Sequence, residues 1–257
     1  MNTKIGFTHM PRTGGTYLES IISESMGPDE FINFFGTPNE QKLNKISIVE
    51  NISKDNKKQK DILNLKSWDK CILFSGHFSL NIKKFLPSQY NYKFITIIRN
   101  PLDRVVSFVK KITSSRAFKQ YITDDKQIDE SVFWSNYIDY VGKQKSIGLM
   151  PHERNGFNNY YTKVLAEEDL SNPFLFADED MLDKAISNVD NFLYVGLFEK
   201  YTETLHDICN ILSVPCNMHE KKRNNHTIPD KAKEFIVQNN YCDIELYRYI
   251  QEKYYEK

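Results

Sequence analysis

Two short stretches of this sequence combine charged, hydroxyl and glycine residues in patterns suited to binding an anion. The first reads HMPRTGGT, from His9 to Thr16. Paired glycines let a backbone wrap closely around an oxyanion, while arginine and threonine side chains add hydrogen-bond donors. The loop follows a short apolar stretch and leads into an amphipathic one. It therefore resembles a strand-to-helix joint, where the N-terminus of the helix attracts negative charge.

This loop differs from the common phosphate-binding patterns. The Walker A loop places lysine directly after a glycine, whereas Arg12 precedes Gly14 and Gly15 here, and the G-x-G-x-x-G pattern is absent. The alternative interpretation is a tight connection closed by a capping threonine, without any ligand.

The second stretch, RNPLDRVVSF, starts at Arg99 and supplies Ser107 two helical turns later. The planar fork of arginine suits a phosphate, and a hydroxyl on the following helix can complete the site. The alternative is a surface arginine and a helix serine in an ordinary α/β crossover. Two anion sites on neighbouring strands would predict a ligand with phosphates at both ends.

The elements that position these residues alternate along the chain. Asn100 and Pro101, with an acidic residue two positions later, are typical of a helix start. Alternating strands and helices predict a parallel sheet covered on both faces, in a single domain of residues 1–257 with a variable insertion at about 27–69. We predict strands at Lys4 to Thr8, Cys71 to Ser75, Lys93 to Ile98 and Phe192 to Val195, and helices at Thr16 to Met26, Leu80 to Leu86, Asp129 to Val141, Asn158 to Leu165, Glu199 to Leu212 and from Pro229 onward.

Composition narrows the class of protein. The chain has 34 basic and 34 acidic residues, so no global field favours nucleic acid. Its four cysteines show no metal-ligand spacing and suggest a reducing compartment. With no apolar run long enough to span a bilayer and no signal-peptide core, we expect a cytoplasmic protein, although a chain trimmed of a membrane anchor would look the same. The oligomeric state is not indicated.

Together, HMPRTGGT and FITIIRNPLDRVVSF resemble the paired cofactor signatures of sulfotransferases, in particular the branch of the Golgi carbohydrate sulfotransferases and their bacterial relatives. The resemblance continues through SGHF, FNNYYTKVLAEED, VGLFEKYTETL and the C-terminal NNHTIPDKAKEFIVQNNYCDIELYRY. It implies a P-loop-like, three-layer α/β fold that needs no metal ion. It also implies 3′-phosphoadenosine-5′-phosphosulfate (PAPS) as donor and 3′,5′-adenosine bisphosphate as product.

The resemblance also implies residue roles. The 5′-phosphosulfate would be held by the first loop, and the 3′-phosphate by Arg99 and Ser107, with Asn158 near the nucleotide. Arg12 stands where the family usually has lysine, so its action on the leaving phosphate differs in geometry. The residues expected in the first loop are Arg12, Thr13, Gly14, Gly15, Thr16 and Tyr17.

A histidine is the candidate general base. His77 follows a buried strand at the sheet edge where α/β ligands bind, and neutral imidazole can accept a proton from an acceptor hydroxyl. The resemblance places a catalytic histidine in a similar block. His77 can instead cap the next helix or bind a backbone carbonyl, and His9 is a competing candidate beside the first loop.

The predicted function is sulfuryl transfer to a hydroxyl of a carbohydrate or related acceptor, with Arg12 and His77 as catalytic residues. A nucleotide kinase and a non-catalytic nucleotide-binding module are the alternatives. The segments Gly27 to Asp69 and Ile112 to Glu153 match no pattern, so the acceptor is not identified. Tyr160 and Tyr161 either flank the adenine or belong to the core.

Overall fold

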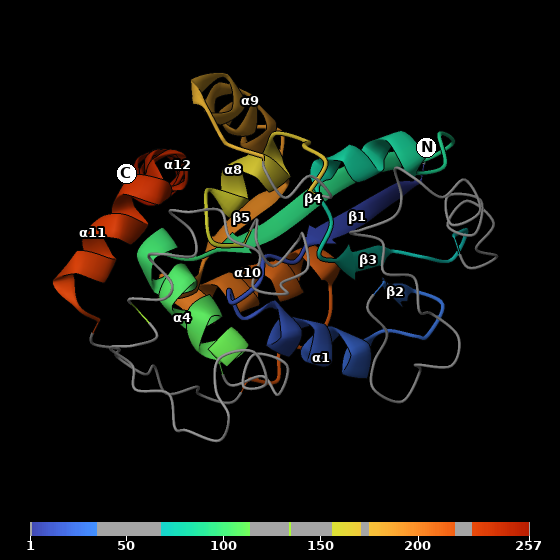
Figure 1. The fold of residues 1–257 in the computed structure, drawn as a ribbon. Coiled ribbons are helices and arrows are strands. Elements are labelled where there is room, and N and C mark those ends of the chain that lie inside the picture. Colours follow the sequence, from blue (N-terminus) through green and yellow to red (C-terminus); the bar gives the residue numbers. More distant parts are fainter. Residues whose placement is uncertain are drawn as a thin grey trace, which may run out of the picture.

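The computed structural model describes residues 2–34, 68–113, 134, 156–170, 175–218 and 228–256. Within them lies a five-stranded sheet in the order β2-β3-β1-β4-β5, in which every neighbouring pair is parallel (Figure 1). The strands are β1 (Thr3–Thr8), β2 (Phe31–Asn33), β3 (Leu73–Gly76), β4 (Asn91–Ile98) and β5 (Tyr194–Leu197). The expected α/β fold with a parallel sheet is confirmed.

The strand β2 was not predicted. It has three residues, Phe31–Asn33, and lies inside the segment interpreted as a variable insertion. Its backbone pairs with β3 from Phe31 opposite Leu73 to Asn33 opposite Ser75. A run of three residues carries too little alternation to be distinguished from a loop. Residues 35–67, most of the expected insertion, lie outside the described part.

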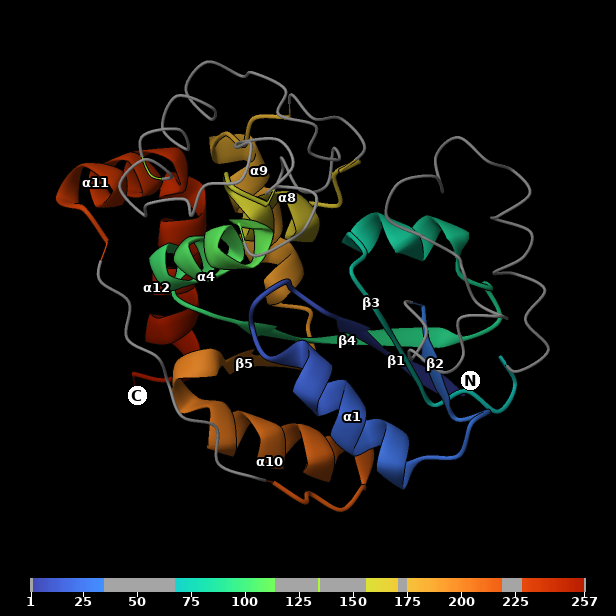
Figure 2. The ribbon, with the colours of Figure 1, turned by 60° about the horizontal axis from the view of Figure 1, so that its bottom comes forward.

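Helices cover both faces of the sheet. One face carries α1 (Gly15–Ser25) and α10 (Tyr201–Leu212), and the other carries the 3-10 helix η1 (Leu80–Phe85) with α8 (Tyr160–Leu165), α9 (Glu179–Val189) and α12 (Tyr241–Tyr254) (Figure 2). A third apolar cluster joins α4 (Pro101–Thr113) to α11 (Asp230–Asn239). A further 3-10 turn, η2 (Phe198–Lys200), connects β5 to α10.

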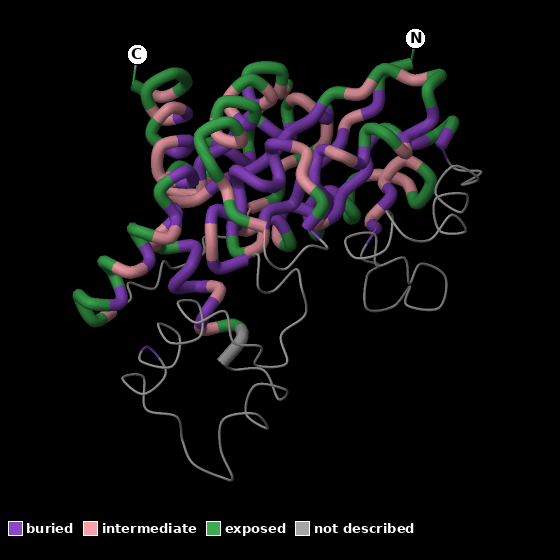
Figure 3. The backbone as a smooth tube through the Cα atoms, turned by 45° about the horizontal axis from the view of Figure 1, so that its top comes forward, coloured by how far each residue is buried: buried purple, intermediate pink, exposed green. Residues whose placement is uncertain are grey.

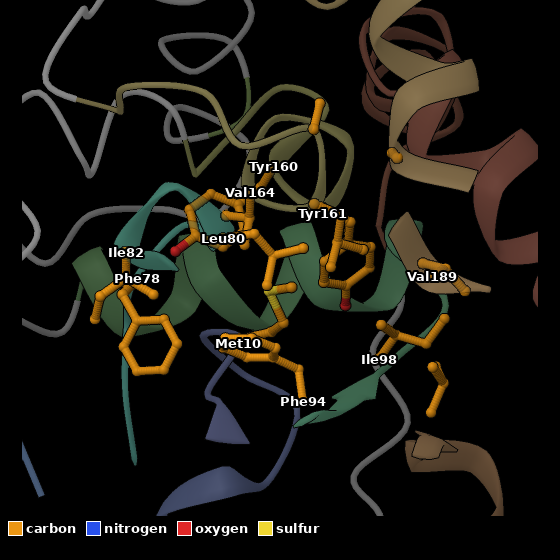
Figure 4. Close-up of a cluster of buried hydrophobic side chains, with 14 of the residues drawn as sticks. Met10, Phe78, Leu80, Ile82, Phe94, Ile98, Tyr160, Tyr161, Val164 and Val189 are labelled. Atoms are coloured by element: carbon orange, nitrogen blue, oxygen red, sulfur yellow. The ribbon is translucent and has the colours of Figure 1, made fainter. Parts of the chain in front are cut away.

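The interior strand β4, between β1 and β5, shows why both faces of the sheet need a cover. Ile95 and Ile97 are fully buried against α1 and α10, while Phe94 and Ile98 are buried in the main core on the opposite face. Side chains alternate across a strand, so an apolar run buries both faces of the sheet. In space, the buried segments lie in the interior of the described part of the protein (Figure 3). Figure 4 shows the main core with Phe94, Ile98 and Tyr161.

The helix predictions are confirmed where the structure describes them, with shifts of a few residues at the ends. The helix α9 was not predicted, although the apolar residues of its sequence EDMLDKAISNV recur at helical spacing and pack against the main core. It is capped by Asp178, whose side chain accepts a hydrogen bond from the Met181 N–H at 2.9 Å. Apart from Trp134, the predicted helix at Asp129 to Val141 lies outside the described residues. Among the described helices, none is both long and apolar enough to cross a membrane.

The strand order decides which loops meet. Strand β1 lies between β3 and β4, with Thr8 opposite Gly76 on one side and opposite Thr96 on the other. In a parallel sheet the carboxyl ends of neighbouring strands share one edge, where ligands of α/β proteins bind. The loop after β1 is therefore flanked by His77, which follows β3, and by Arg99, which follows β4.

Candidate functional site

The first joint, residues 9–14, connects β1 to α1 through a left-handed turn. Gly14 is the N-cap of α1 with φ of 87°, a conformation that glycine adopts at no steric cost. Because glycine has no side chain, no side-chain cap occupies the start of α1. The N–H groups of the first turn lack acceptors within the helix, so this end can bind an anion. Arg12 also has a positive φ, 71°, which turns the loop back toward the sheet edge.

His9 supports this loop from the protein interior. A Cβ atom at Gly15 would lie only 2.2 Å from His9 Cδ2, so the ring contacts the backbone where a larger residue would not fit. The His9 Nδ1 atom lies 3.0 Å from Glu19 Oε1, which also accepts a hydrogen bond from the Ser75 hydroxyl. The ring is 5% exposed. His9 thus shapes the loop, which weakens it as a candidate base.

Other side chains also fix the loop. The sequence predicts the Thr13 hydroxyl as a donor to the anion, but in the structure this hydroxyl donates to the Met10 carbonyl at 2.7 Å within the turn. The Tyr201 hydroxyl, from α10, donates to the Gly14 carbonyl at 2.6 Å. Thr16 is exposed and Tyr17 is half-buried in the first turn of α1. Of the predicted loop residues, Thr16 therefore remains the exposed hydroxyl.

The second joint, between β4 and α4, is built differently. The Asn100 side chain caps α4 by accepting a hydrogen bond from the Leu102 N–H at 3.0 Å, as its sequence predicted. This helix start is therefore occupied, and the donors for an anion come from side chains. The guanidinium of Arg99 lies over the Phe198 ring, 4.6 Å from its centroid. Its Nε is buried and has no hydrogen-bond partner among the described residues.

The two joints are in direct contact. The Arg12 Nε donates a hydrogen bond to the Ser107 hydroxyl at 3.0 Å, across 95 residues of sequence. Partial burial, and next the positive charge of Arg99, lower the pKa of the Arg12 guanidinium below its ordinary value. An anion bound beside Arg12 would offset the unfavourable effect of this second positive charge. The structure thus brings Arg12, Arg99 and Ser107 together.

His77 lies on the other side of the first loop. Its Nδ1 is 2.5 Å from the backbone carbonyl of His9, and the two rings are 4.4 Å apart between centroids. A carbonyl oxygen only accepts hydrogen bonds, so Nδ1 carries the proton and the neutral ring keeps its basic lone pair on Nε2. The carbonyl contact considered as an alternative is therefore present, and it selects the tautomer that a general base requires.

Asn158 precedes α8 and is half-buried. Its Oδ1 is buried without a hydrogen-bond partner in the described part of the chain, so it can accept a hydrogen bond from a ligand. The following residues Tyr160 and Tyr161 belong to the main hydrophobic core, at 3% and 0% exposure. Of the two alternatives, the structure therefore favours the core: both rings are buried in it and do not flank a ligand.

Several residues around the joints were not predicted from the sequence. Tyr201 contacts the first loop, and Glu199 accepts a hydrogen bond from the Asn100 N–H at 2.8 Å. Both lie in VGLFEKYTETL, a stretch whose resemblance was noted without a role for its side chains. Among the residues that the structure describes, no group of three or more His, Cys, Asp or Glu side chains is arranged to hold a metal ion.

Comparison with known proteins gives a family. The model of the sulfotransferase family matches residues 2–250. The fold is similar to a crystal structure of a sulfotransferase from Alicyclobacillus acidocaldarius, with 13% identity, a TM-score of 0.46 and coverage of 95% of this chain and 96% of that chain. No curated protein matches. Because the family model spans nearly the whole chain, this protein belongs to the sulfotransferase family, whose members transfer a sulfuryl group to an acceptor.

Proposed function

We propose that this enzyme takes PAPS as its donor and transfers the sulfuryl group to a hydroxyl of a carbohydrate or a related acceptor. The hydrogen bond between Arg12 and Ser107, 3.0 Å long, is the observation that supports this most strongly. It makes the two joints parts of one site, as a ligand with phosphates at both ends requires. The uncapped start of α1 and the unpaired Nε of Arg99 suit two separate anionic groups.

In this proposal each joint has its own part of the donor. The backbone N–H groups at Gly15 and Thr16 hold the 5′-phosphosulfate, and Arg99 with Ser107 holds the 3′-phosphate. Arginine offers five donors, so Arg12 can bind Ser107 through Nε and still donate from its terminal nitrogens to the leaving phosphate. Asn158 accepts a hydrogen bond from the adenine. No residue in this scheme depends on a metal ion.

The chemical step is an in-line displacement at sulfur. The acceptor oxygen forms a bond to sulfur while the bond from sulfur to the bridging oxygen of the donor breaks, releasing 3′,5′-adenosine bisphosphate. The proton of the acceptor hydroxyl passes to Nε2 of His77, whose Nδ1–H is held by the His9 carbonyl. Negative charge grows on the departing phosphate, where Arg12 and the first turn of α1 stabilise it.

Nucleotide binding is the first test. We expect 3′,5′-adenosine bisphosphate to bind in a calorimetric titration without magnesium, and Arg99→Ala to weaken that binding by a factor of about ten to a hundred, because a charge-assisted bond is lost. Arg248→Ala is the control, since that arginine is exposed on α12 and pairs with Glu245 at 2.9 Å. Equal binding by the Arg99 variant and the wild type would contradict the proposed 3′-phosphate site.

Turnover is the second test. Sulfate-labelled PAPS is incubated with a panel of oligosaccharides and, in parallel, with phenols and alcohols that carry no sugar. We expect label on the carbohydrates and a loss of turnover of about a hundredfold or more in His77→Ala, with donor binding retained. Label on phenols alone would overturn the proposed acceptor class. Binding without turnover on any acceptor would favour a non-catalytic nucleotide-binding module.

A further inference from the structure

Arg99 is the first residue beyond β4, where the backbone leaves the sheet. The pairing of β4 with β5 ends at Ile98 opposite Leu197. From there the hydroxyl of Tyr161 serves both backbone groups of Arg99. It accepts from the Arg99 N–H at 3.0 Å and donates to the Arg99 carbonyl at 3.1 Å. Tyr161 is fully buried, and backbone groups left unpaired in such surroundings are costly.

The position of Tyr161 is fixed in turn by the C-terminal helix α12. The fully buried Asp243 carboxylate accepts hydrogen bonds from the Tyr161 N–H at 3.1 Å and from the Thr162 N–H at 2.8 Å. The Asp243 N–H donates back to Asn159 Oδ1 at 3.1 Å. These reciprocal bonds connect the starts of α8 and α12, which are about 80 residues apart in sequence. The backbone at Tyr161 is therefore anchored to α12, and its ring is buried in the main core.

The side chain of Arg99 is held from another direction. Its guanidinium rests on Phe198, and the N–H of the next residue, Asn100, donates to Glu199 Oε1 at 2.8 Å. The backbone is thus fixed by one element, α8, and the guanidinium is oriented by another, η2. An arginine side chain is long and flexible, so the place of its charged end depends on a fixed backbone beneath it.

We propose that Tyr161 is a positioning residue for the 3′-phosphate site, and that through Asp243 it couples α12 to the discrimination between nucleotides with and without a 3′-phosphate. This inference rests on the proposed function, because it takes Arg99 as the ligand of the 3′-phosphate. Tyr161 contacts neither the nucleotide nor the reacting atoms. Its effect is expected on binding of the 3′-phosphate and not on the first joint.

The test compares two tyrosines that differ in this hydrogen bond. Tyr160 is adjacent and buried, and the guanidinium of Arg104 lies over both rings, 5.4 Å from the Tyr160 centroid and 5.1 Å from that of Tyr161. Tyr161→Phe and Tyr160→Phe each remove only a hydroxyl from the full-length protein. Each variant is titrated with 3′,5′-adenosine bisphosphate and with adenosine 5′-monophosphate, which lacks the 3′-phosphate.

We expect Tyr161→Phe to weaken binding of 3′,5′-adenosine bisphosphate about fivefold, the effect of one hydrogen bond, and binding of adenosine 5′-monophosphate less than about twofold. The affinity ratio of the two nucleotides should stay at the wild-type value in Tyr160→Phe. A wild-type protein that binds both nucleotides equally would refute the proposed 3′-phosphate site and this inference with it. An affinity ratio of the two nucleotides that is the same in Tyr161→Phe as in the wild type would overturn the inference alone.

A second measurement uses the wild-type protein alone, so it does not depend on whether a variant folds. In the wild-type protein without nucleotide, the Arg99 amide should exchange its hydrogen slowly, because it donates to a fully buried hydroxyl. Rapid exchange of that amide would show that Tyr161 does not hold it and would overturn the inference.

Discussion

The two joints offer hydrogen-bond donors to an anion in different ways, although both connect a parallel strand to a helix. At the first, α1 begins at Gly14 without a side-chain cap, so backbone N–H groups are the donors. At the second, Asn100 already caps α4, and the donors are the side chains of Arg99 and Ser107. Side chains from distant elements support both joints, since Tyr201 contacts the first loop and Phe198 lies against Arg99 at the second. The comparison shows two ways in which a strand-to-helix joint can present donors, from the backbone of a helix start or from side chains.

The largest effect should come from closing the space at the first joint. In Gly15→Ala the added Cβ would lie 2.2 Å from His9 Cδ2, so the ring or the loop must move. We expect a loss of about 3 kcal/mol of unfolding free energy, typical of severe overpacking, and loss of adenosine 5′-monophosphate binding. Thermal unfolding and calorimetry measure the two effects.

Gly27→Ala is the matched control for this substitution, because a Cβ there meets only the end of the Glu30 side chain, at 3.2 Å. If Gly15→Ala bound adenosine 5′-monophosphate as the wild type does, the first joint would not depend on its backbone shape.

The helix α8, whose Tyr161 contacts Arg99, carries a buried charge that should make stability depend on pH. Lys163 on α8 is 1% exposed, and burial lowers the pKa of its ammonium to about 8 from an ordinary 10.5. Between these values the unfolded chain binds more protons than the folded one, so stability rises with pH. Through Lys163, the free energy of unfolding should therefore rise by as much as about 3 kcal/mol between pH 8 and pH 10.5.

Chemical denaturation at several pH values checks this prediction. The difference in unfolding free energy between wild type and Lys163→Met should change in favour of the wild type as pH rises through that range. The Asp243 carboxylate and the Arg104 guanidinium act on this lysine in opposite directions, the first raising and the second lowering its pKa. A difference that stays constant with pH would mean that Lys163 is not buried as an ammonium group.

A smaller effect, on nucleotide binding, should distinguish the two joints at the point where they are in contact. Ser107→Ala removes the hydroxyl that accepts from Arg12 at 3.0 Å and that we assign to the 3′-phosphate. We expect adenosine 3′-monophosphate to bind about tenfold more weakly and adenosine 5′-monophosphate to bind almost unchanged. Ser20→Ala, at an exposed hydroxyl of α1 that donates to the Tyr17 carbonyl, is the control. Equal losses for both nucleotides would show that the joints do not bind separate phosphates.

The smallest effect is expected at the support of the first joint. Tyr201→Phe removes the hydrogen bond to the Gly14 carbonyl, which still accepts the Tyr17 N–H at 3.0 Å. We expect adenosine 5′-monophosphate to bind about threefold more weakly, with adenosine 3′-monophosphate unchanged. Tyr241→Phe, on an exposed ring of α12, is the control. A larger loss for the 3′-nucleotide would reverse the assignment of this tyrosine to the first joint.

Much of the fold could be predicted because its signals are local. The apolar run of β4 and the Asn100-Pro101 helix start each identify an element from a few adjacent residues. The strand β2 was missed because three residues carry little periodic signal, whereas α9 was overlooked although its apolar residues follow the helical period and Asp178 caps it. At the site, the sequence indicated candidate anion-binding residues, but it could not show that the Thr13 hydroxyl donates within the loop.

The sequence by itself determined that two joints follow apolar strands, one with paired glycines and one with an arginine. These features are local, because helix starts, turns and strand patterns depend on neighbouring residues. Only the tertiary structure decided that β1 lies between β3 and β4, and so that His77 and Arg99 flank one loop. It also decided that Arg12 reaches Ser107 and that Tyr161 holds the backbone of Arg99. These contacts join residues tens of positions apart, and strand order and side-chain packing are set by the folded core as a whole.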